Sequence, residues 1–161
     1  MSVYDVALIV LSDRASEGTY ADTSLATMKE RLGPSYRVVR ELLMPDDPGA
    51  LQAEMIDLAD TGTAALILTS GGTGLSLRDR TPQATAAVLD YEVPGIAEAI
   101  RAASIPIVKT AMLSRALAGV RHRTLIVNLP GNPKAVSQTL EVVLPVLPHA
   151  LELLAGNRPD G

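Results

Sequence analysis

The glycine-rich run Thr69-Ser70-Gly71-Gly72-Thr73-Gly74 is the segment of this sequence best suited to bind an anion. Glycine lacks a side chain, so this backbone can adopt positive φ angles and expose its N–H groups. Consecutive N–H groups of this kind converge on a phosphate as a nest. The run has none of the spacings of a Walker A loop, a dinucleotide-binding fingerprint or a nucleophile elbow. By itself it is as compatible with a tight turn that binds no ligand as with a phosphate site.

Charged residues near this run have the types that phosphate chemistry needs. Arg78-Asp79-Arg80 follows it closely, and Asp46-Asp47 follows an earlier apolar run. Carboxylates and substrate phosphates are ligands of Mg²⁺, and arginine holds phosphate oxygens through parallel hydrogen bonds. Asp46 and Asp79 are therefore candidate magnesium ligands, and Arg78 is a candidate phosphate contact. The alternatives are a solvated ion pair at residues 78–80 and a turn or helix cap at residues 46–47.

A second glycine- and proline-rich stretch spans residues 130–134 and also follows an apolar run. Its last residue, Lys134, stands at the start of a predicted helix, where a cation opposes the positive end of the helix dipole. An anionic ligand explains such a lysine better than helix stability does.

Polar residues also follow the first apolar run, where Ser12 and Asp13 come directly after Leu11. They would either hydrogen-bond a polar ligand or close the loop, and Thr69 and Ser70 have the same two interpretations. Each polar segment thus begins near the end of a predicted strand. Open parallel sheets bind ligands at the carboxyl ends of their strands, so the sequence predicts that these segments meet at one edge.

The elements that position these residues are predicted from hydrophobic pattern. Four apolar runs rich in Val, Ile and Leu have the length and flanking turn signals of buried strands. The segments between them space their apolar residues at helical intervals. This alternation is typical of an α/β fold with a mostly parallel sheet. The predicted strands are residues 3–11, 36–44, 64–69 and 124–129, and the predicted helices are residues 23–32, 50–60, 81–90, 96–103 and 134–154.

Capping and helix-breaking residues mark several helix ends. Asp22 is a candidate N-cap for the first helix, and Gly33-Pro34 ends it. Thr81-Pro82 is a strong helix start, with Thr as N-cap and Pro in the first helical position. The two prolines of the last predicted helix would kink or break it. Residues 107–123 have the weakest pattern, which fits a short helix over residues 112–115 and then a strand that turns at residues 121–123.

The composition excludes several classes of function. The 161 residues suit a single domain, and the absence of cysteine excludes disulfides, thiolate zinc sites and a cysteine nucleophile. It also fits a reducing cytoplasm. With four Tyr, no Phe and no Trp, the core must be aliphatic, and few side chains remain to stack on nucleic-acid bases. The net charge of −4 and the lack of an apolar stretch of about 20 residues argue against nucleic-acid and membrane binding.

Taken together, these segments resemble the molybdopterin adenylyltransferase family, the MogA/MoaB group, which is related to the G domain of gephyrin. The resemblance covers nearly the whole chain. The pattern Gly-Gly-Thr-Gly followed by Arg-Asp-x-Thr-Pro is highly specific in combination, whereas Gly-Gly-Thr-Gly alone is not. The matching segments are residues 11–22, the turn at Pro45-Asp46, and residues 69–74, 78–82 and 128–134.

The resemblance implies a three-layer α/β/α sandwich that forms a homotrimer. It implies one molybdopterin-binding domain over residues 1–155, with a frayed tail over residues 156–161. In the implied reaction, the terminal phosphate of molybdopterin attacks the α-phosphate of MgATP, which gives adenylylated molybdopterin and pyrophosphate. A hand-off of this product to a molybdate-insertion protein, and a cytoplasmic location, are further expectations.

Matching the family pattern residue by residue gives a candidate site. Asp46 and Asp79 match the two functionally important aspartates and are the candidate catalytic and Mg²⁺-binding residues. Few aromatic side chains are available to stack on the pterin, namely Tyr20 and Tyr91. The candidate substrate-binding residues are Ser12, Asp13, Thr69, Ser70, Gly71, Gly72, Thr73, Gly74, Arg78, Pro130, Gly131, Asn132 and Lys134.

Two positions depart from the commonest family pattern, and two other functions compete with the enzyme. Gln83 stands where an acidic residue is frequent, and Asn132 occupies a variable position. A non-catalytic molybdopterin carrier or scaffold of the same fold is the alternative function. A molybdate-insertion domain is a third one, and the chain length points away from it because such modules usually lie in longer chains.

Overall fold

A six-stranded sheet with the strand order β2-β1-β3-β6-β5-β4 forms the centre of the computed structural model, which describes residues 2–18 and 23–158. The four strands β2, β1, β3 and β6 are parallel, whereas β5 and β4 are added to one edge by antiparallel pairing. The predicted mostly parallel sheet is confirmed. The strands are β1 (Tyr4–Leu11), β2 (Tyr36–Met44), β3 (Leu66–Ser70), β4 (Tyr91–Glu92), β5 (Ala118–Arg121) and β6 (Thr124–Leu129).

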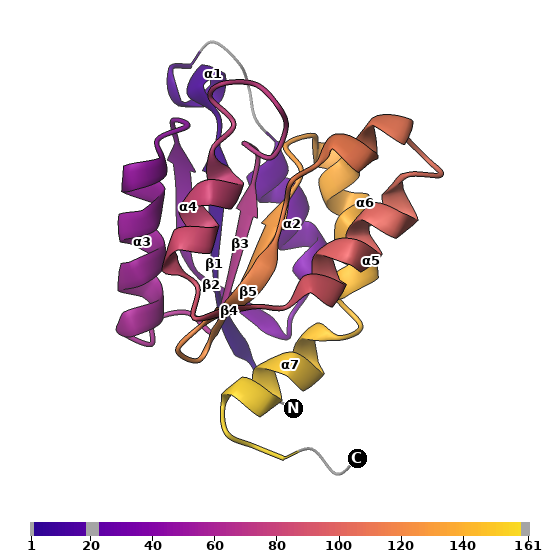
Figure 1. Cartoon of the computed structure of the whole chain (residues 1–161). Helices are drawn as coiled ribbons and strands as arrows, with labels where there is room; N and C mark the ends of the chain where they lie inside the picture. The colour runs from indigo at the N-terminus through magenta and orange to yellow at the C-terminus, as the bar shows by residue number, and fades with distance from the viewer. Residues whose placement is uncertain (1, 19–22, 159–161) are drawn as a thin grey trace.

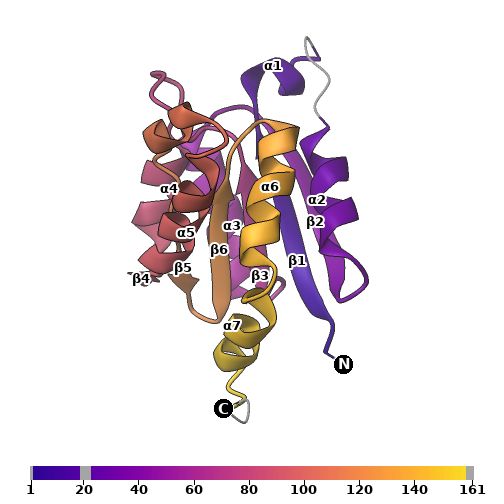
Figure 2. The same ribbon diagram turned by 90° about the vertical axis from the view of Figure 1, so that its right-hand side faces the viewer.

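Helices cover both faces of this sheet (Figures 1 and 2). One face packs against α2 (Ser24–Leu32), α5 (Pro94–Ser104), α6 (Pro133–Val143) and α7 (Leu147–Leu154). The other face packs against α3 (Pro48–Asp60) and α4 (Thr81–Val88). The predicted three-layer α/β/α sandwich is therefore confirmed.

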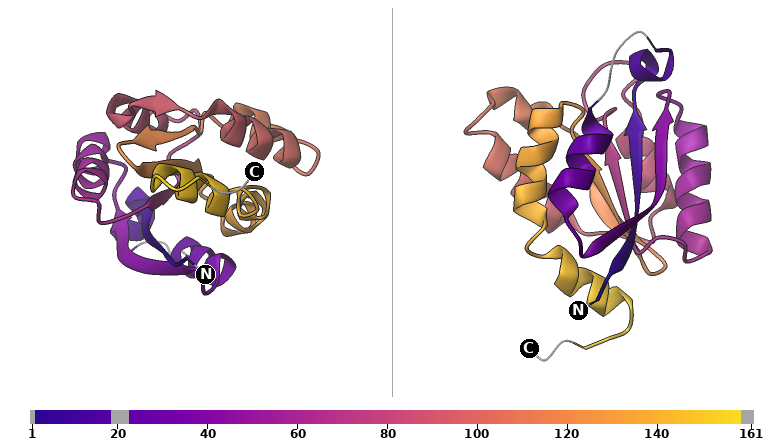
Figure 3. Two further views of the ribbon diagram at one scale, coloured as in Figure 1. Left: turned by 90° about the horizontal axis from the view of Figure 1, so that it is seen from below. Right: turned by 180° about the vertical axis from the view of Figure 1, so that it is seen from behind.

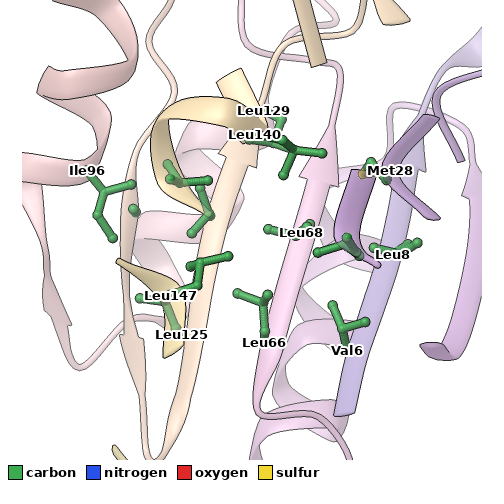
Figure 4. Close-up of a cluster of buried hydrophobic side chains, with 14 of the residues drawn as sticks. Val6, Leu8, Met28, Leu66, Leu68, Ile96, Leu125, Leu129, Leu140 and Leu147 are labelled. Carbon is green, nitrogen blue, oxygen red and sulfur yellow. The ribbon is translucent and has the colours of Figure 1, made fainter. Parts of the chain in front are cut away.

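Side-chain alternation along the strands builds two aliphatic cores. In β1, Val6 and Leu8 face one core, and Ala7 and Ile9 face the other. All residues of β3 and β6 are buried, as expected for strands covered on both faces. Figure 4 shows the larger core, in which the leucines of β3 and β6 meet side chains from α2, α6 and α7.

Most predicted helices are present, with ends shifted by a few residues. Helix α2 ends at Gly33, whose φ of +75° stops it, but its predicted cap Asp22 lies outside the described residues, as does Tyr20. Helix α3 begins at Pro48, two residues before the predicted start, because the Asp47 carboxylate caps it by accepting from the Ala50 N–H at 3.1 Å. Helix α4 starts at Thr81 as predicted and ends at Val88, but the prediction of Thr81 as N-cap is wrong, because Arg80 is the N-cap and Thr81 is the first helical residue.

Three short elements differ from the sequence prediction. Residues 13–16 form a helical turn, α1 (Asp13–Ser16), where a loop is predicted, and the two-residue strand β4 is not predicted. The short helix in the weakest segment is a 3₁₀ helix, η1 (Lys109–Leu113), rather than a helix over residues 112–115. The predicted break in the last helix is confirmed at Pro145, because residues 144–146 divide it into α6 and α7.

The carboxyl ends of the parallel strands lie at one end of the molecule. Helix α1 and the long connection from β3 to α4 lie at this end, and α7 lies at the opposite end (Figures 1 and 3). Among the described helices, none is long and apolar enough to cross a membrane. Asn157 bonds to Glu152 through its backbone and side chain, at 3.0 and 2.6 Å. The domain limit at residue 155 and the frayed tail stay predictions.

Candidate active site

Gly71 lies at the point where the ends of β1, β3 and β6 come together. Its N–H donates to the Leu129 carbonyl at 3.1 Å, and its φ is +99°. A Cβ atom at this position would overlap the carbonyl oxygen of Leu11. A Cβ on Gly131 would lie 3.3 Å from the Gly71 Cα atom, so the two glycine-containing loops are packed together. The structure therefore brings residues 71–74 and 130–134 to the same sheet edge, where the sequence predicts them.

Residues 72–74 have bonded carbonyl oxygens, and their N–H groups have no partner among the described residues. The Gly72 carbonyl accepts from the Thr81 N–H at 3.1 Å, and the Thr73 carbonyl accepts from the Arg115 N–H at 2.9 Å. The Gly74 carbonyl accepts from Arg115 Nε at 2.9 Å. Within the described chain, the N–H groups of residues 72, 73 and 74 have no hydrogen-bond acceptor. Three consecutive amides are thus available to an anionic ligand.

Asp13 and Asp46 join the ends of β1 and β2 through a reciprocal pair of hydrogen bonds. The Asp46 N–H donates to Asp13 Oδ1 at 2.8 Å, and the Asp13 N–H donates to Asp46 Oδ2 at 3.2 Å. Arg78 binds the same Asp13 carboxylate with two nitrogen atoms, Nε and Nη2, each at 2.9 Å. Arg78, predicted as a phosphate contact, therefore forms the alternative ion pair here, with Asp13 rather than with its neighbour Asp79.

The two carboxylates differ in their electrostatic environment. Hydrogen bonds from Arg78, and then from the Asp46 N–H, hold the pKa of Asp13 below its usual value. Burial raises the pKa of Asp46, and the negative charges of Asp13 and Asp79 raise it further against the effect of the Asp13 N–H. The ionised Asp46 is therefore the less stabilised carboxylate, and a cation beside it would relieve that cost.

Asp46 and Asp79 both lie beside the glycine loop. Asp46 Oδ1 lies 3.2 Å from the position of a Cβ on Gly72, and Asp79 Oδ2 lies 2.9 Å from that of a Cβ on Gly74. Asp79 Oδ2 also accepts from the Ser76 N–H at 3.1 Å. No group of three or more His, Cys, Asp or Glu residues in residues 2–18 and 23–158 could hold a metal. Two carboxylates together with substrate phosphates nevertheless form a donor set that suits Mg²⁺.

A pocket of about 440 Å³ opens beside the glycine loop. Thr73, Gly74, Pro130, Asn132 and Lys134 line it on the side of the strand ends. Helix α5, the following turn and α6 form its other walls, with a mostly aliphatic lining that includes Ile100, Ile107, Leu113 and Ala135. The described part of the chain offers no ion-pair partner to Lys134. The pocket thus combines a largely apolar interior with two cations, Lys134 at its edge and Arg101 of α5, whose guanidinium donates to the Ser114 and Ala116 carbonyls.

Four predicted site residues use their side chains inside the protein. Thr69 and Ser70 are fully buried: Thr69 Oγ1 accepts from Asn128 Nδ2 at 2.9 Å, and Ser70 Oγ donates to the Pro130 carbonyl at 2.8 Å. Ser12 caps α1, and Asn132 caps α6. These side chains shape the loops, and their contact with a substrate stays a prediction.

Asn128 and Arg115 contribute to the site without having been singled out as site residues in the sequence. Asn128 Nδ2 also donates to Thr85 Oγ1 at 3.1 Å, so it ties β3 and β6 to α4. Asn128 begins a segment that matches the family pattern, which is the signal that pointed to it. Arg115 lies in the segment with the weakest pattern, and no motif marked it.

Comparisons with known proteins agree on one family. The family described as "probable molybdopterin binding domain" matches residues 7–149. The molybdopterin adenylyltransferase of Helicobacter pylori (strain J99) is 38% identical over 160 residues, which covers 98% of this chain and 91% of that protein. The Escherichia coli K12 molybdopterin adenylyltransferase is 41% identical over 146 residues, which covers 89% and 75%. The crystal structure of the molybdopterin biosynthesis enzyme MoaB from Thermus thermophilus gives a TM-score of 0.90 at 46% identity, covering 96% and 98%.

The contacts of Gly72 predict a large effect for Gly72→Ala. The added Cβ would overlap Thr81 Oγ1 and press on Asp46, in addition to the strain of a φ of +69°. Gly62 is the matched control, because it has the same φ of +69° with nothing within 4 Å of its added Cβ. We expect Gly62→Ala to lower the free energy of unfolding by about 1–2 kcal/mol, and Gly72→Ala by a further ~1–3 kcal/mol. Equal losses in urea titrations would show that Gly72 is not sterically constrained.

The ion pair of Asp13 predicts a shift of its titration in Arg78→Met. Because Arg78 lowers the pKa of Asp13, we expect the midpoint of Asp13 in a carboxyl NMR titration to rise in this variant. A carboxylate with a lowered pKa stabilises the fold above its unfolded pKa, and this contribution is lost as the pH falls through its folded pKa. The variant should therefore be less stable than the wild type at neutral pH, and the difference should vanish in acid.

Arg80→Met removes an equal charge two residues away and serves as the control for this titration. An Asp13 midpoint that moves as far in Arg80→Met as in Arg78→Met would contradict the specific ion pair.

Proposed function

The chain belongs to the molybdopterin-binding family of molybdenum cofactor biosynthesis, and on that premise we propose that it is a molybdopterin adenylyltransferase. In this reaction an oxygen of the terminal phosphate of molybdopterin forms a bond to the α-phosphorus of ATP. The bond between that phosphorus and the oxygen leading to the β-phosphate breaks, and pyrophosphate leaves. The named activity of relatives at 37–41% identity over most of the chain supports this proposal.

The observation that carries the proposal is the row of three available amides at Gly72, Thr73 and Gly74. Phosphoryl and nucleotidyl transfer depend mainly on positioning and on neutralising negative charge. Fixed backbone N–H groups do this without reorganisation during the reaction. A protein nucleophile is not needed, because the substrate phosphate attacks, and this agrees with a chain that contains no cysteine.

The pocket beside these amides is suited to the organic part of a substrate. Its volume of about 440 Å³ lies in the range of small-molecule sites. The aliphatic wall from α5 and α6 would exclude water from bound substrate. Lys134, exposed at the start of α6, would attract the phosphates toward the amides of the glycine loop.

Asp46 and Asp79 would hold Mg²⁺ together with phosphate oxygens of ATP. Both are hard oxygen donors and both lie against the glycine loop, and burial together with the charges of Asp13 and Asp79 raises the pKa of Asp46. Bound Mg²⁺ supplies positive charge that offsets the charge of the phosphates. The residues do the positioning: Asp46 from the end of β2, and Asp79 from the loop before α4.

We expect the purified protein, with molybdopterin, MgATP and pyrophosphatase, to incorporate AMP into the pterin. Asp79→Asn keeps the size of the side chain but removes its charge. It should lower turnover by about 10²-fold or more and change pterin affinity by less than about threefold. Asp57→Asn on the exposed side of α3 is the charge-matched control and should turn over like the wild type.

Two results would contradict these roles. If the wild type binds molybdopterin tightly but never transfers AMP, the protein is a carrier or scaffold instead of the enzyme. If Asp79→Asn loses pterin binding while turnover per bound pterin is unchanged, Asp79 is not a metal ligand.

The proposed assembly is a homotrimer. Exposed apolar side chains gather between α5 and β5, where Ile107 is 58% and Met112 is 59% exposed. Exposed apolar side chains that gather in this way mark a surface that a partner subunit covers, because covering them removes apolar surface from water. We further propose that the trimer acts in the cytoplasm and passes its product to a molybdate-insertion protein.

Light scattering at micromolar concentration tests the trimer. The wild type should have three times the mass of one chain, and Met112→Asp should shift the population toward monomers by about tenfold or more, because it places a charge in the interface. Val3→Asp, at a similarly exposed position (58%), should stay trimeric. A monomeric wild type would contradict the proposed assembly.

A further inference from the structure

Arg115 connects both ends of the loop that carries Asp79. Its backbone N–H donates to the Thr73 carbonyl at 2.9 Å, and its Nε donates to the Gly74 carbonyl at 2.9 Å. Its Nη2 donates to the Asp79 carbonyl at 2.6 Å. One residue from the segment between η1 and β5 therefore makes three hydrogen bonds that span residues 73 to 79. The side chain is half-buried, so these bonds are partly shielded from water.

The loop has few other attachments to the body of the protein. It contains no helix or strand between Ser70 and Thr81, and Leu77 in its middle is 94% exposed. The bonds between Ser76 and Asp79 give the loop its local shape but do not anchor it. The ion pair of Arg78 with Asp13 is exposed and is weakened by salt. Arg115 is therefore the attachment best placed to fix the loop.

The bonds of Arg115 also orient the amides of the glycine loop. The described residues contain no cis peptide bond. In a trans peptide the C=O and the N–H point in opposite directions. Because the backbone N–H of Arg115 holds the Thr73 carbonyl, the Gly74 N–H of the same peptide group is directed away from Arg115, and a change of the Arg115 side chain leaves this bond in place. A bonded carbonyl also polarises its peptide group, which makes that N–H a stronger donor to an anion.

We propose that Arg115 is a positioning residue for adenylyl transfer. Its side chain holds the Gly74 and Asp79 carbonyls, and so it sets the position of Asp79 relative to the glycine loop, so that both act on one bound phosphate group. The inference rests on the proposed function for its reaction, but the fixed loop is a property that is measured separately. Arginine is required because its planar fork reaches two carbonyl oxygens at once, whereas a lysine ammonium acts as a single point donor.

The test compares Arg115→Met and Arg115→Lys with Arg121→Met. Arg121 is the matched control, because it is also a partly buried arginine that donates to a backbone carbonyl, that of Val88 at 2.8 Å, on the hairpin at the far end of the sheet. We expect Arg115→Met to lower kcat by about 10- to 100-fold with the pterin KM changed by less than about threefold. Arg115→Lys should recover part of this loss. Arg121→Met should lower stability without lowering kcat at a temperature where it is folded.

Hydrogen exchange gives the readout that does not depend on activity. In Arg115→Met the amides of Ser76 and Asp79 should exchange faster than in the wild type, because the loop that holds their acceptors is released. In Arg121→Met they should exchange at the wild-type rate. Arg115→Lys allows the same comparison if Arg115→Met does not fold.

The outcomes separate this inference from the proposed function. A wild type that forms no adenylylated pterin contradicts the proposed function itself. An active wild type together with an Arg115→Met variant of unchanged kcat overturns the positioning role. Unchanged exchange at Ser76 and Asp79 overturns it too. Equal losses of kcat in Arg115→Met and Arg121→Met would mean that both residues act through global stability, and this would also overturn it.

Discussion

The close approach of Gly71 to the Leu11 carbonyl is the constraint on which the site depends. The parallel strands β1, β3 and β6 end close to one another. Only a residue without a side chain fits where the chain leaves β3 beside the end of β1. Gly131 completes this contact from β6. Because the strand ends are packed without spare volume, the loops that follow them have fixed starting points. The positions of the free amides, of Asp46 and Asp79, and of the pocket beside the glycine loop depend on these starting points.

Some charged side chains around these loops have a partner of opposite charge, and others have none within the described residues. Asp13 is compensated by Arg78, but Asp46 is half-buried among other carboxylates, and its pKa is raised. Lys134 stays without an ion-pair partner in the described part of the chain. Such an arrangement does not serve stability, since burying a carboxylate that is only partly compensated costs free energy. It suits a molecule that gains its missing charges from a bound ligand.

The sequence predicted the elements that are long enough to show a periodic apolar pattern, and it missed the shortest ones. The bounds of β2 and β6 were predicted to the residue, because turn residues flank each apolar run. Helix α1 and strand β4 are too short for a period to appear. Arg115 could not be found, because its partners are backbone carbonyls and leave no pattern of complementary side chains. The burial of Thr69 likewise depends on Asn128, whose proximity comes from strand pairing rather than from sequence distance.

The bidentate pair of Arg78 and Asp13 has a consequence for selectivity. A guanidinium that already holds one carboxylate through two nitrogen atoms gains little by exchanging it for another single carboxylate. Only a ligand with more charge per oxygen, or one that also reaches the neighbouring amides, makes the exchange favourable. The resident carboxylate of Asp13 therefore competes with any anionic ligand for Arg78.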